Sequence, residues 1–247
     1  MNNINDSYFD GYYKDIWRSI IPEVLTRREV EFIIQYFNLV PGDAVLDLMC
    51  GYGRHTLALA REGIQVTAVD NLPHYAEEIV REAAASQLPV TVITGSVISA
   101  PVTGHYKLAV CMGNSLNFFP PEQLQPLLKR VAGWLVPGGH FLVNSWSLTE
   151  IAVPAFREHS DQQIGEYRFI NESRMLQDPP RIEINTTIIP ASGEPENRTA
   201  VDYLYTLDEL KTTLSDAGLA PEAVFSIPGK KYFTAGEPRA YIVARKS

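Results

Sequence analysis

The stretch Ala44-Val-Leu-Asp-Leu-Met-Cys-Gly-Tyr-Gly-Arg-His-Thr56 decides the fold of this chain. Residues 45–48 form a mostly apolar run that is too short for a helix and is bounded by turn residues, so it predicts a buried strand. Gly51 and Gly53 follow and indicate a tight turn where a ligand can approach the backbone. Helical sequence begins at about Arg54. A strand, a Gly-x-Gly turn and a helix form the first half of a nucleotide site in a doubly wound α/β fold.

Composition narrows the class of protein. The chain has 247 residues, of which 45% are hydrophobic and 20% charged, which suits one large α/β domain with a small appendage. A net charge of −8 argues against a nucleic-acid partner, because an acidic surface repels a phosphate backbone. No apolar stretch approaches the roughly 20 residues of a membrane span, and the first residues lack a signal-peptide pattern. We therefore expect no membrane partner and a cytoplasmic location, where Cys50 and Cys111 remain reduced thiols.

Strands alternate with helices through the first 145 residues, which predicts a mostly parallel sheet. The capping-box pattern of Thr26 and Glu29 predicts that an early helix begins at Thr26. After the quoted stretch, the expected helices cover residues 54–62, 73–86 and 121–135, and the expected strands cover residues 64–69, 90–93, 106–112 and 140–145.

The pattern changes after Trp146. Residues 165–205 show strand patterns without intervening helices, and alternation along residues 182–188 predicts a strand with one buried face. We expect an antiparallel meander there, followed by a last helix that starts after Thr206 and ends near Gly218. The predicted architecture is a Rossmann-like, doubly wound, mostly parallel seven-stranded sheet with this meander inserted before the last helix. Its expected parts are an N-terminal helical lid (1–38), a cofactor-binding core (39–150), the meander (151–205) and a C-terminal helix with the last strands (206–247).

Asp70 points to a nucleoside ligand. It closes the second strand about 20 residues after Gly51, where an acidic residue binds ribose hydroxyls. The dinucleotide fingerprint Gly-x-Gly-x-x-Gly fails, because Thr56 occupies the third glycine position. Asp47 argues against a pyrophosphate and favours a ligand that carries a positive charge.

These motifs resemble the class I S-adenosylmethionine-dependent methyltransferases, and in particular their small-molecule branch. Residues 45–55 are similar to the first motif of the family, and residues 68–70 to the second. Residues 129–143 are similar to the helix and strand near the end of the family core, and residues 205–219 to its closing helix. The resemblance spans roughly residues 35–245.

The resemblance implies S-adenosyl-L-methionine as cofactor and methyl transfer to a small-molecule acceptor by in-line displacement. It places Asp47, Gly51 and Gly53 around the methionine portion, Asp70 on the ribose, Ser96 and Val97 at the adenine, and Met112, Gly113 and Asn114 near the sulfonium. Arg54 and Asn71 join this expected cofactor site, and Tyr13 and Trp17 would close over it. Many family members carry an acidic residue where Ser96 stands, so a hydroxyl or backbone contact to the adenine is expected here.

Acceptor contacts are expected from the meander and the sheet edge, and the candidates are Trp146, Arg168, Arg174, Tyr203 and Tyr205. The alternative for each is an exposed meander face or an interface in a homodimer. No catalytic base is assigned, because the sulfur leaving group needs no proton and the need for a base depends on the nucleophile. His55 is interpreted as a packing or capping residue, and no metal ligands are expected, since the histidines lack ligand spacing.

Three other interpretations compete. A non-catalytic S-adenosylmethionine-binding sensor or partner subunit would carry the same binding motifs. An NAD-binding domain would share the glycine turn. A serine hydrolase is suggested by residues 113–117, which resemble Gly-x-Ser-x-Gly but end in Asn117, and no histidine follows His159 to serve as its base.

Overall fold

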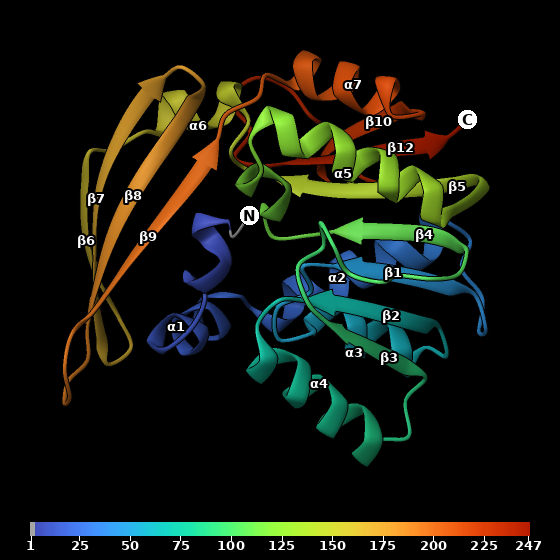
Figure 1. Ribbon diagram of the computed structural model, residues 1–247, viewed down its shortest axis with the longest axis horizontal. Coiled ribbons are helices and arrows are strands. Elements are labelled where there is room, and N and C mark those ends of the chain that lie inside the picture. Colours follow the sequence, from blue (N-terminus) through green and yellow to red (C-terminus); the bar gives the residue numbers. More distant parts are fainter. Residues whose placement is uncertain (1–2) are drawn as a thin grey trace.

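The structure of the protein, a computed structural model, describes residues 3–247 and contains two β-sheets (Figure 1). The larger sheet has the strand order β11-β10-β12-β5-β4-β1-β2-β3. Its strands are β1 (Ala44–Leu48), β2 (Gln65–Asp70), β3 (Val90–Thr94), β4 (Tyr106–Cys111), β5 (Leu135–Ser145), β10 (Leu219–Ile227), β11 (Lys231–Tyr232) and β12 (Ala240–Lys246). Strands β1 to β5 run parallel, and β12 joins β5 antiparallel.

Strand β1 lies between β2 and β4, so the chain changes direction across the sheet at this strand. Such a switch point leaves a crevice beyond the carboxyl ends of the strands, where α/β proteins bind ligands. The turn of residues 49–53, between β1 and the helix that follows it, therefore opens onto this crevice.

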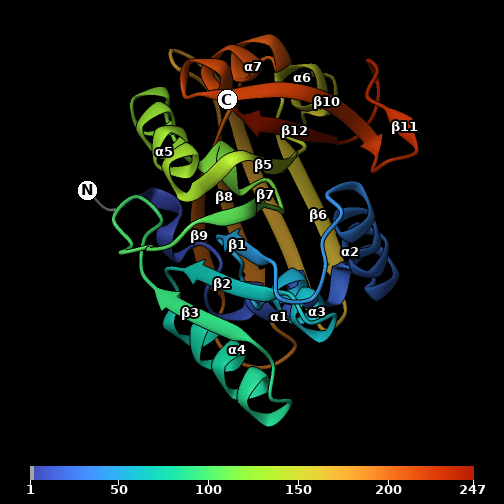
Figure 2. The same cartoon turned by 90° about the vertical axis from the view of Figure 1, so that its right-hand side faces the viewer.

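Helices cover both faces of the large sheet (Figure 2). On one face lie α2 (Glu23–Tyr36), α3 (Arg54–Arg61) and α4 (Pro73–Ala85), and on the other α5 (Pro121–Trp134) and α7 (Leu207–Asp216). Shorter elements are η1 (Ile4–Ser7), α1 (Tyr12–Ile20), η2 (Ser115–Phe118) and α6 (Thr149–Ala155). Leu46 packs toward α5 and Val45 toward α2 and α3, as expected for neighbouring side chains of a strand buried on both faces.

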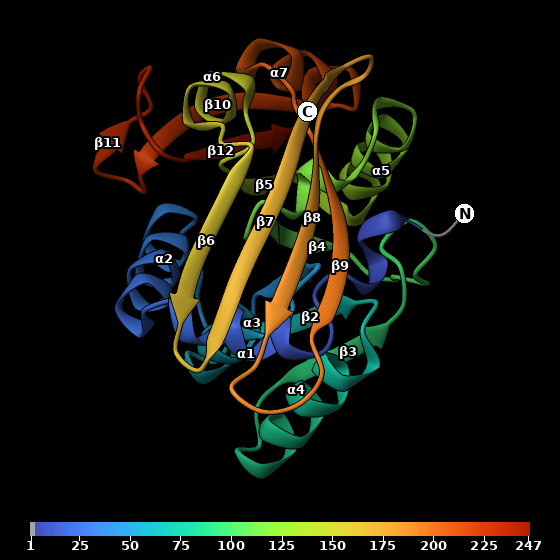
Figure 3. The same ribbon diagram turned by 90° about the vertical axis from the view of Figure 1, so that its left-hand side faces the viewer.

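The second sheet is an antiparallel meander of β6 (His159–Ile164), β7 (Tyr167–Gln177), β8 (Pro180–Ile189) and β9 (Glu196–Tyr203). Figure 3 shows these long strands in front of the core, with the N-terminal segment between the two sheets. The inner face of the meander buries Ile188 and Ala200 against Tyr8, Tyr13 and Ile16 of that segment. The N-terminal segment therefore joins the meander to the core.

The fold prediction is confirmed: a mostly parallel Rossmann-like sheet carries a separate antiparallel meander before the last helix. The large sheet has an eighth strand, because the two-residue β11 pairs with the end of β10. β5 begins at Leu135 rather than at residue 140, and helix α6 was not expected. The domain bounds given above stay a prediction.

The prediction that a helix begins at Thr26 is wrong. Helix α2 begins at Glu23, directly after Pro22, and Thr26 lies inside its first turns. Proline suits a helix start because its φ is fixed and it has no N–H to satisfy. The two residues of the expected capping box instead face Arg54: Thr26 Oγ1 accepts a hydrogen bond of 3.0 Å from its guanidinium, and Glu29 pairs with it.

Candidate active site

Asp70 is held against the glycine turn by backbone donors. Gly51 N donates to Oδ2 at 2.8 Å, and Leu72 N donates to Oδ1 at 3.0 Å. Parallel pairing of β1 with β2 brings the two strand ends together, so residues 19 apart in sequence meet there. Burial raises the pKa of Asp70, and the two backbone hydrogen bonds oppose that rise. The carboxylate is thus fixed at the edge of the turn, facing the crevice.

The two glycines of the turn are needed for different physical reasons. Gly51 has φ +56°, and a Cβ built there would meet no atom within 4 Å, so open space lies beside its backbone. Gly53 has φ +77°, and a Cβ there would come within 2.6 Å of Ile79 on α4. Gly51 therefore leaves room for a ligand, whereas Gly53 allows α3 and α4 to pack closely.

Asp47 is buried at the end of β1 and is 1% exposed. Its Oδ2 accepts a hydrogen bond of 2.6 Å from Thr56 Oγ1. Burial raises the pKa of Asp47, while the nearby charges of His55 and Arg54 and the Thr56 hydrogen bond lower it. Thr56, which stands at the third glycine position of the dinucleotide pattern, therefore binds this carboxylate through its hydroxyl.

A cavity that opens to solvent lies beyond these strand ends. Ten of the thirteen residues expected to bind cofactor line it: Trp17, Asp47, Gly51, Arg54, Asp70, Asn71, Ser96, Val97, Met112 and Gly113. The other three, Tyr13, Gly53 and Asn114, lie next to lining residues rather than in the wall. Their roles in binding remain predictions.

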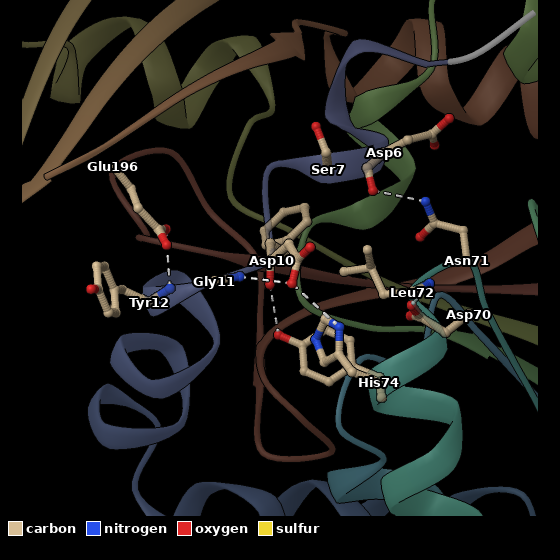
Figure 4. Close-up of polar contacts among 12 residues, drawn as sticks. Asp6, Ser7, Asp10, Gly11, Tyr12, Asp70, Asn71, Leu72, His74 and Glu196 are labelled. Carbon is tan, nitrogen blue, oxygen red and sulfur yellow. Dashed lines mark hydrogen bonds and ion pairs between the residues drawn. The ribbon is translucent and has the colours of Figure 1, made fainter. Parts of the chain in front are cut away.

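The N-terminal segment closes one side of the cavity, to which Asn5, Asp6, Phe9 and Trp17 contribute. Figure 4 shows its contacts with the start of α4: Asn71 Nδ2 donates to Asp6 O at 2.9 Å, and His74 Nδ1 lies 3.4 Å from Asp10 Oδ1. The side-chain amide of Asn71, expected to contact the cofactor, is therefore already engaged with this segment.

The same segment is bound to the meander. Asn5 Oδ1 accepts from Val201 N at 2.8 Å, and Asn5 Nδ2 donates to Val201 O at 3.0 Å. Tyr12 N donates to Glu196 Oε2 at 3.1 Å, also visible in Figure 4. The N-terminal residues therefore form a strap from the core to the meander across the cavity.

Glu29 forms a buried polar cluster behind the cavity wall. Its Oε2 lies 2.5 Å from Arg54 Nη1 and 2.9 Å from His55 Nε2, and its Oε1 accepts from Tyr241 at 2.7 Å. Burial opposes ionisation of Glu29, but the hydrogen bond and charge of His55 and the charge of Arg54 outweigh it and lower the pKa to about 2. Arg54 and His55, which both line the cavity, are thereby oriented from behind.

A second polar cluster lies between the core and the meander. Asp202 Oδ2 on β9 accepts from Ser147 Oγ at 2.6 Å and from Asn114 Nδ2 at 3.2 Å. Asn114 Oδ1 in turn accepts from the backbone N–H of Trp146 and Ser147 at 2.9 and 3.0 Å. Burial raises the pKa of Asp202 to about 6, against the lowering effect of its two hydrogen bonds.

Sequence reasoning missed Glu29 and Asp202 as site residues. Asp202 had no signal in its own strand, because Glu196 and Arg198 share its face of β9; only the register, which pairs it with Ile182, places it on the face of Ile184 and Ile188. Glu29 had no signal either, because its position fitted a surface capping box.

The residues expected to contact the methyl acceptor do not lie together in the structure. Trp146 lies 5.9 Å from Trp17 between ring centroids, at the cavity side. Arg168 and Arg174 are exposed and pair with Asp161 and Glu183 on the meander, so the structure does not bring them to the cavity. The two tyrosines pack under α5 and α7, and Tyr205 donates to Phe119 O at 2.7 Å, so its hydroxyl is not free for a ligand.

Comparisons with known proteins agree with this geometry. The methyltransferase domain model matches residues 45–139. The carboxy-S-adenosyl-L-methionine synthase of Photorhabdus laumondii is 28% identical over 181 residues, which cover 68% of this chain and 66% of that protein. The chain spans 45% and 63% of the next two such relatives.

Solved structures show the same fold. A Clostridium acetobutylicum S-adenosylmethionine-dependent methyltransferase matches with a TM-score of 0.83 at 18% identity, covering 95% of this chain and 96% of that one. CalS10, an amino pentose methyltransferase of Micromonospora echinaspora solved with S-adenosylmethionine bound, matches with a TM-score of 0.69 at 16% identity, covering 96% and 98%.

The fold, the domain match and the glycine turn with its two carboxylates are typical of the class I methyltransferases that use S-adenosyl-L-methionine. Residues 45–139 match the methyltransferase domain, and the chain is similar to S-adenosylmethionine-dependent enzymes. Its own residues fit that cofactor: Asp47 and Asp70 supply negative charge to a cationic nucleoside, and the space beside Gly51 admits it. Among residues 3–247 no helix has the length and apolar character needed to cross a membrane.

Proposed function

We propose that this protein transfers the methyl group of S-adenosylmethionine to a small-molecule acceptor. The observation that carries the proposal is the cavity at the switch point, where the Asp47 and Asp70 carboxylates converge on the Gly51 turn. The neighbour named as an amino pentose methyltransferase acts on a small molecule, as its name states, and supports the same substrate class here.

In this proposal the chain contributes binding and alignment. Asp70 holds ribose hydroxyls, and Asp47 attracts the cationic end of the cofactor. Ser96 and Val97 flank the adenine, and Met112, Gly113 and Asn114 line the methyl-donating end. When bound, the cofactor supplies a methyl group on sulfur, which leaves as a neutral thioether and needs no proton from the protein. Proximity and water exclusion then account for most of the rate.

The strap formed by the N-terminal segment supplies the water exclusion. Trp17 and Phe9 line the cavity, and hydrogen bonds hold the segment to both sheets. An acceptor must therefore enter between the strap, the meander and the strand ends. That enclosed geometry favours a small molecule over a folded macromolecule.

Isothermal titration with S-adenosylmethionine, S-adenosylhomocysteine and NAD tests the cofactor. We expect micromolar binding of the first two, on the order of an ordinary metabolite site, and none of NAD. Binding of NAD alone would overturn the proposal. A methyl-transfer assay with small-molecule acceptors then separates an enzyme from a non-catalytic sensor, which would bind without turnover.

A second activity deserves a direct assay, because the sequence relatives are named carboxy-S-adenosyl-L-methionine synthases. Mass spectrometry of the cofactor after incubation with carboxylic acid donors distinguishes the two. A carboxylated cofactor would indicate that second activity, whereas S-adenosylhomocysteine with a methylated acceptor would support methyl transfer.

A further inference from the structure

Asp202 on the meander forms no ion pair with any of residues 3–247. Its Oδ2 accepts from Ser147 and Asn114, while Oδ1 has no hydrogen-bond donor within residues 3–247. The residue as a whole is only partly exposed, and burial raises the pKa of its carboxyl to about 6. A carboxylate largely withdrawn from water is costly unless a ligand balances its charge.

Asp202 stands behind the cavity wall and is connected to it through Asn114. Its partner Asn114 stands between Gly113 and Ser115, both of which line the cavity. Asn114 has φ +70°, and its side-chain oxygen also holds the backbone of Trp146 and Ser147. Asp202 is therefore fixed from one side by residues at the ends of β4 and β5, with Oδ1 left for another partner.

Aromatic rings gather on the same side of the cavity. Tyr13 packs against Phe9 and Trp17, with centroids 5.1 and 6.2 Å apart, and Trp17 lies 5.9 Å from Trp146. Aromatic faces attract cations, and they exclude water from a carboxylate–cation pair. The chemistry of this wall suits a positively charged ligand with an apolar body.

The titratable groups that the Asp202 charge reaches are Tyr8 on η1 and Tyr13 on α1. Burial, and to a smaller extent the charge of Asp202, raises the pKa of Tyr8 to about 12 and that of Tyr13 above its usual value. Both tyrosines therefore stay neutral at physiological pH, and neither compensates the carboxylate.

We propose that Asp202 binds the protonated amine of the methyl acceptor and takes its proton, so that the acceptor class is alkyl amines. This inference rests on the proposed methyl transfer. One N–H bond of the ammonium breaks, its electron pair stays on nitrogen, and the proton goes to Asp202 Oδ1. The neutral amine then carries the lone pair that a methyl acceptor needs, and Asp202 returns the proton to water after release of the product.

Binding of a matched pair of probes tests the proposal. Benzylamine and benzyl alcohol have similar shapes, but only the amine is charged at neutral pH. With S-adenosylhomocysteine present, isothermal titration should show tighter binding of benzylamine to the unaltered protein. Asp202→Asn should weaken benzylamine binding about 30-fold, because a charge-assisted contact is lost, and leave benzyl alcohol unchanged. Equal binding of the two probes, or unchanged amine binding in the variant, overturns the proposal.

Controls separate this inference from the proposed function. Glu172→Gln removes an exposed carboxylate of the same meander and should leave amine binding unchanged. S-adenosylhomocysteine should bind Asp202→Asn as it binds the unaltered protein, whereas failure to bind the unaltered protein would refute the proposed function itself. Asparagine keeps the shape and one acceptor oxygen, and an unchanged circular dichroism spectrum verifies the fold.

A pH titration supplies a second readout. Benzylamine affinity should fall as pH drops through about 6, where Asp202 becomes protonated, and Asp202→Asn should lack this step. A pH-independent affinity in the unaltered protein would contradict a role for the Asp202 charge.

Discussion

The two sides of the cavity are assembled in different ways. On the core side, Gly51 meets Asp70 across 19 residues of sequence and Thr56 meets Asp47 across 9. On the meander side, Asp202 meets Asn114 across 88 residues, and Asn5 meets Val201 across 196. The contacts on the core side therefore join residues within one short motif or in adjacent strands. The contacts on the meander side join segments that are distant in the sequence.

This difference matches the two tasks that we propose. A cofactor shared by a family needs the same turn and the same carboxylates, and adjacent parallel strands supply these locally. An acceptor differs from one enzyme to the next, and an inserted meander with a strap can change without altering the core. The Glu29 cluster is an exception on the core side, because it joins α2 to Tyr241 across 212 residues.

Glu29→Gln tests this exception and carries the largest expected effect. Arg54 and His55 would lose a buried anionic partner, so we expect unfolding to become easier by about 3 kcal/mol. The pKa of Glu29 is lowered from 4.5 to about 2, so its contribution is full above pH 4.5 and is lost as pH falls through about 2. Urea unfolding at neutral pH measures the change, with the exposed Glu31→Gln on the same helix as control. Equal stability of the two variants would make the cluster energetically neutral.

Asp70→Ala probes the core side directly. Removing hydrogen bonds from a carboxylate to ribose hydroxyls costs about 2–3 kcal/mol, which corresponds to roughly 100-fold weaker cofactor binding. Isothermal titration with S-adenosylmethionine measures it. Asp43→Ala, at the opposite end of β1, should bind normally. Unchanged affinity in Asp70→Ala would remove this residue from the site.

Asn5→Ala probes the strap on the meander side. The variant leaves Val201 N and O without their side-chain partners in a buried position, which should cost about 2 kcal/mol of stability. Amide hydrogen exchange should accelerate at Val201 and along η1 more than in the core sheet. Asn197→Ala, at an exposed position of β9, serves as the control. Uniform acceleration throughout the protein would mean that the strap is not a separate unit.

Asp202→Asn should have the smallest effect on stability, and it should stabilise the protein. The pKa of Asp202 is raised from 3.8 to about 6, so ionisation costs the folded state free energy that grows as pH rises from about 4 to 6. Removing the charge should therefore add about 1 kcal/mol above pH 6 and almost nothing below pH 4. Thermal unfolding at both pH values measures the difference. Destabilisation above pH 6 would instead indicate that the charge is balanced within the protein.

The capping-box pattern predicted the start of a helix correctly near the C-terminus and wrongly near the N-terminus. Thr206 and Glu209 form the reciprocal capping box at the start of α7, where a helix start was expected after Thr206. Thr26 and Glu29 show the same spacing without capping a helix. Capping needs only local backbone donors at a solvent-exposed end. Glu29 instead pairs with the buried side chains of Arg54 and His55. The helix already begins at Glu23, directly after Pro22.

Short-range sequence patterns specify the parallel sheet, the meander and the core side of the cavity. Buried strands, glycine turns and strand-end carboxylates act over a few residues, so their order along the chain specifies their geometry. Contacts between distant segments place Asp202 against Asn114, turn Glu29 inward and leave Arg168 and Arg174 on the outer surface. Those outcomes depend on strand register and on packing between distant segments, which side-chain periodicity does not encode.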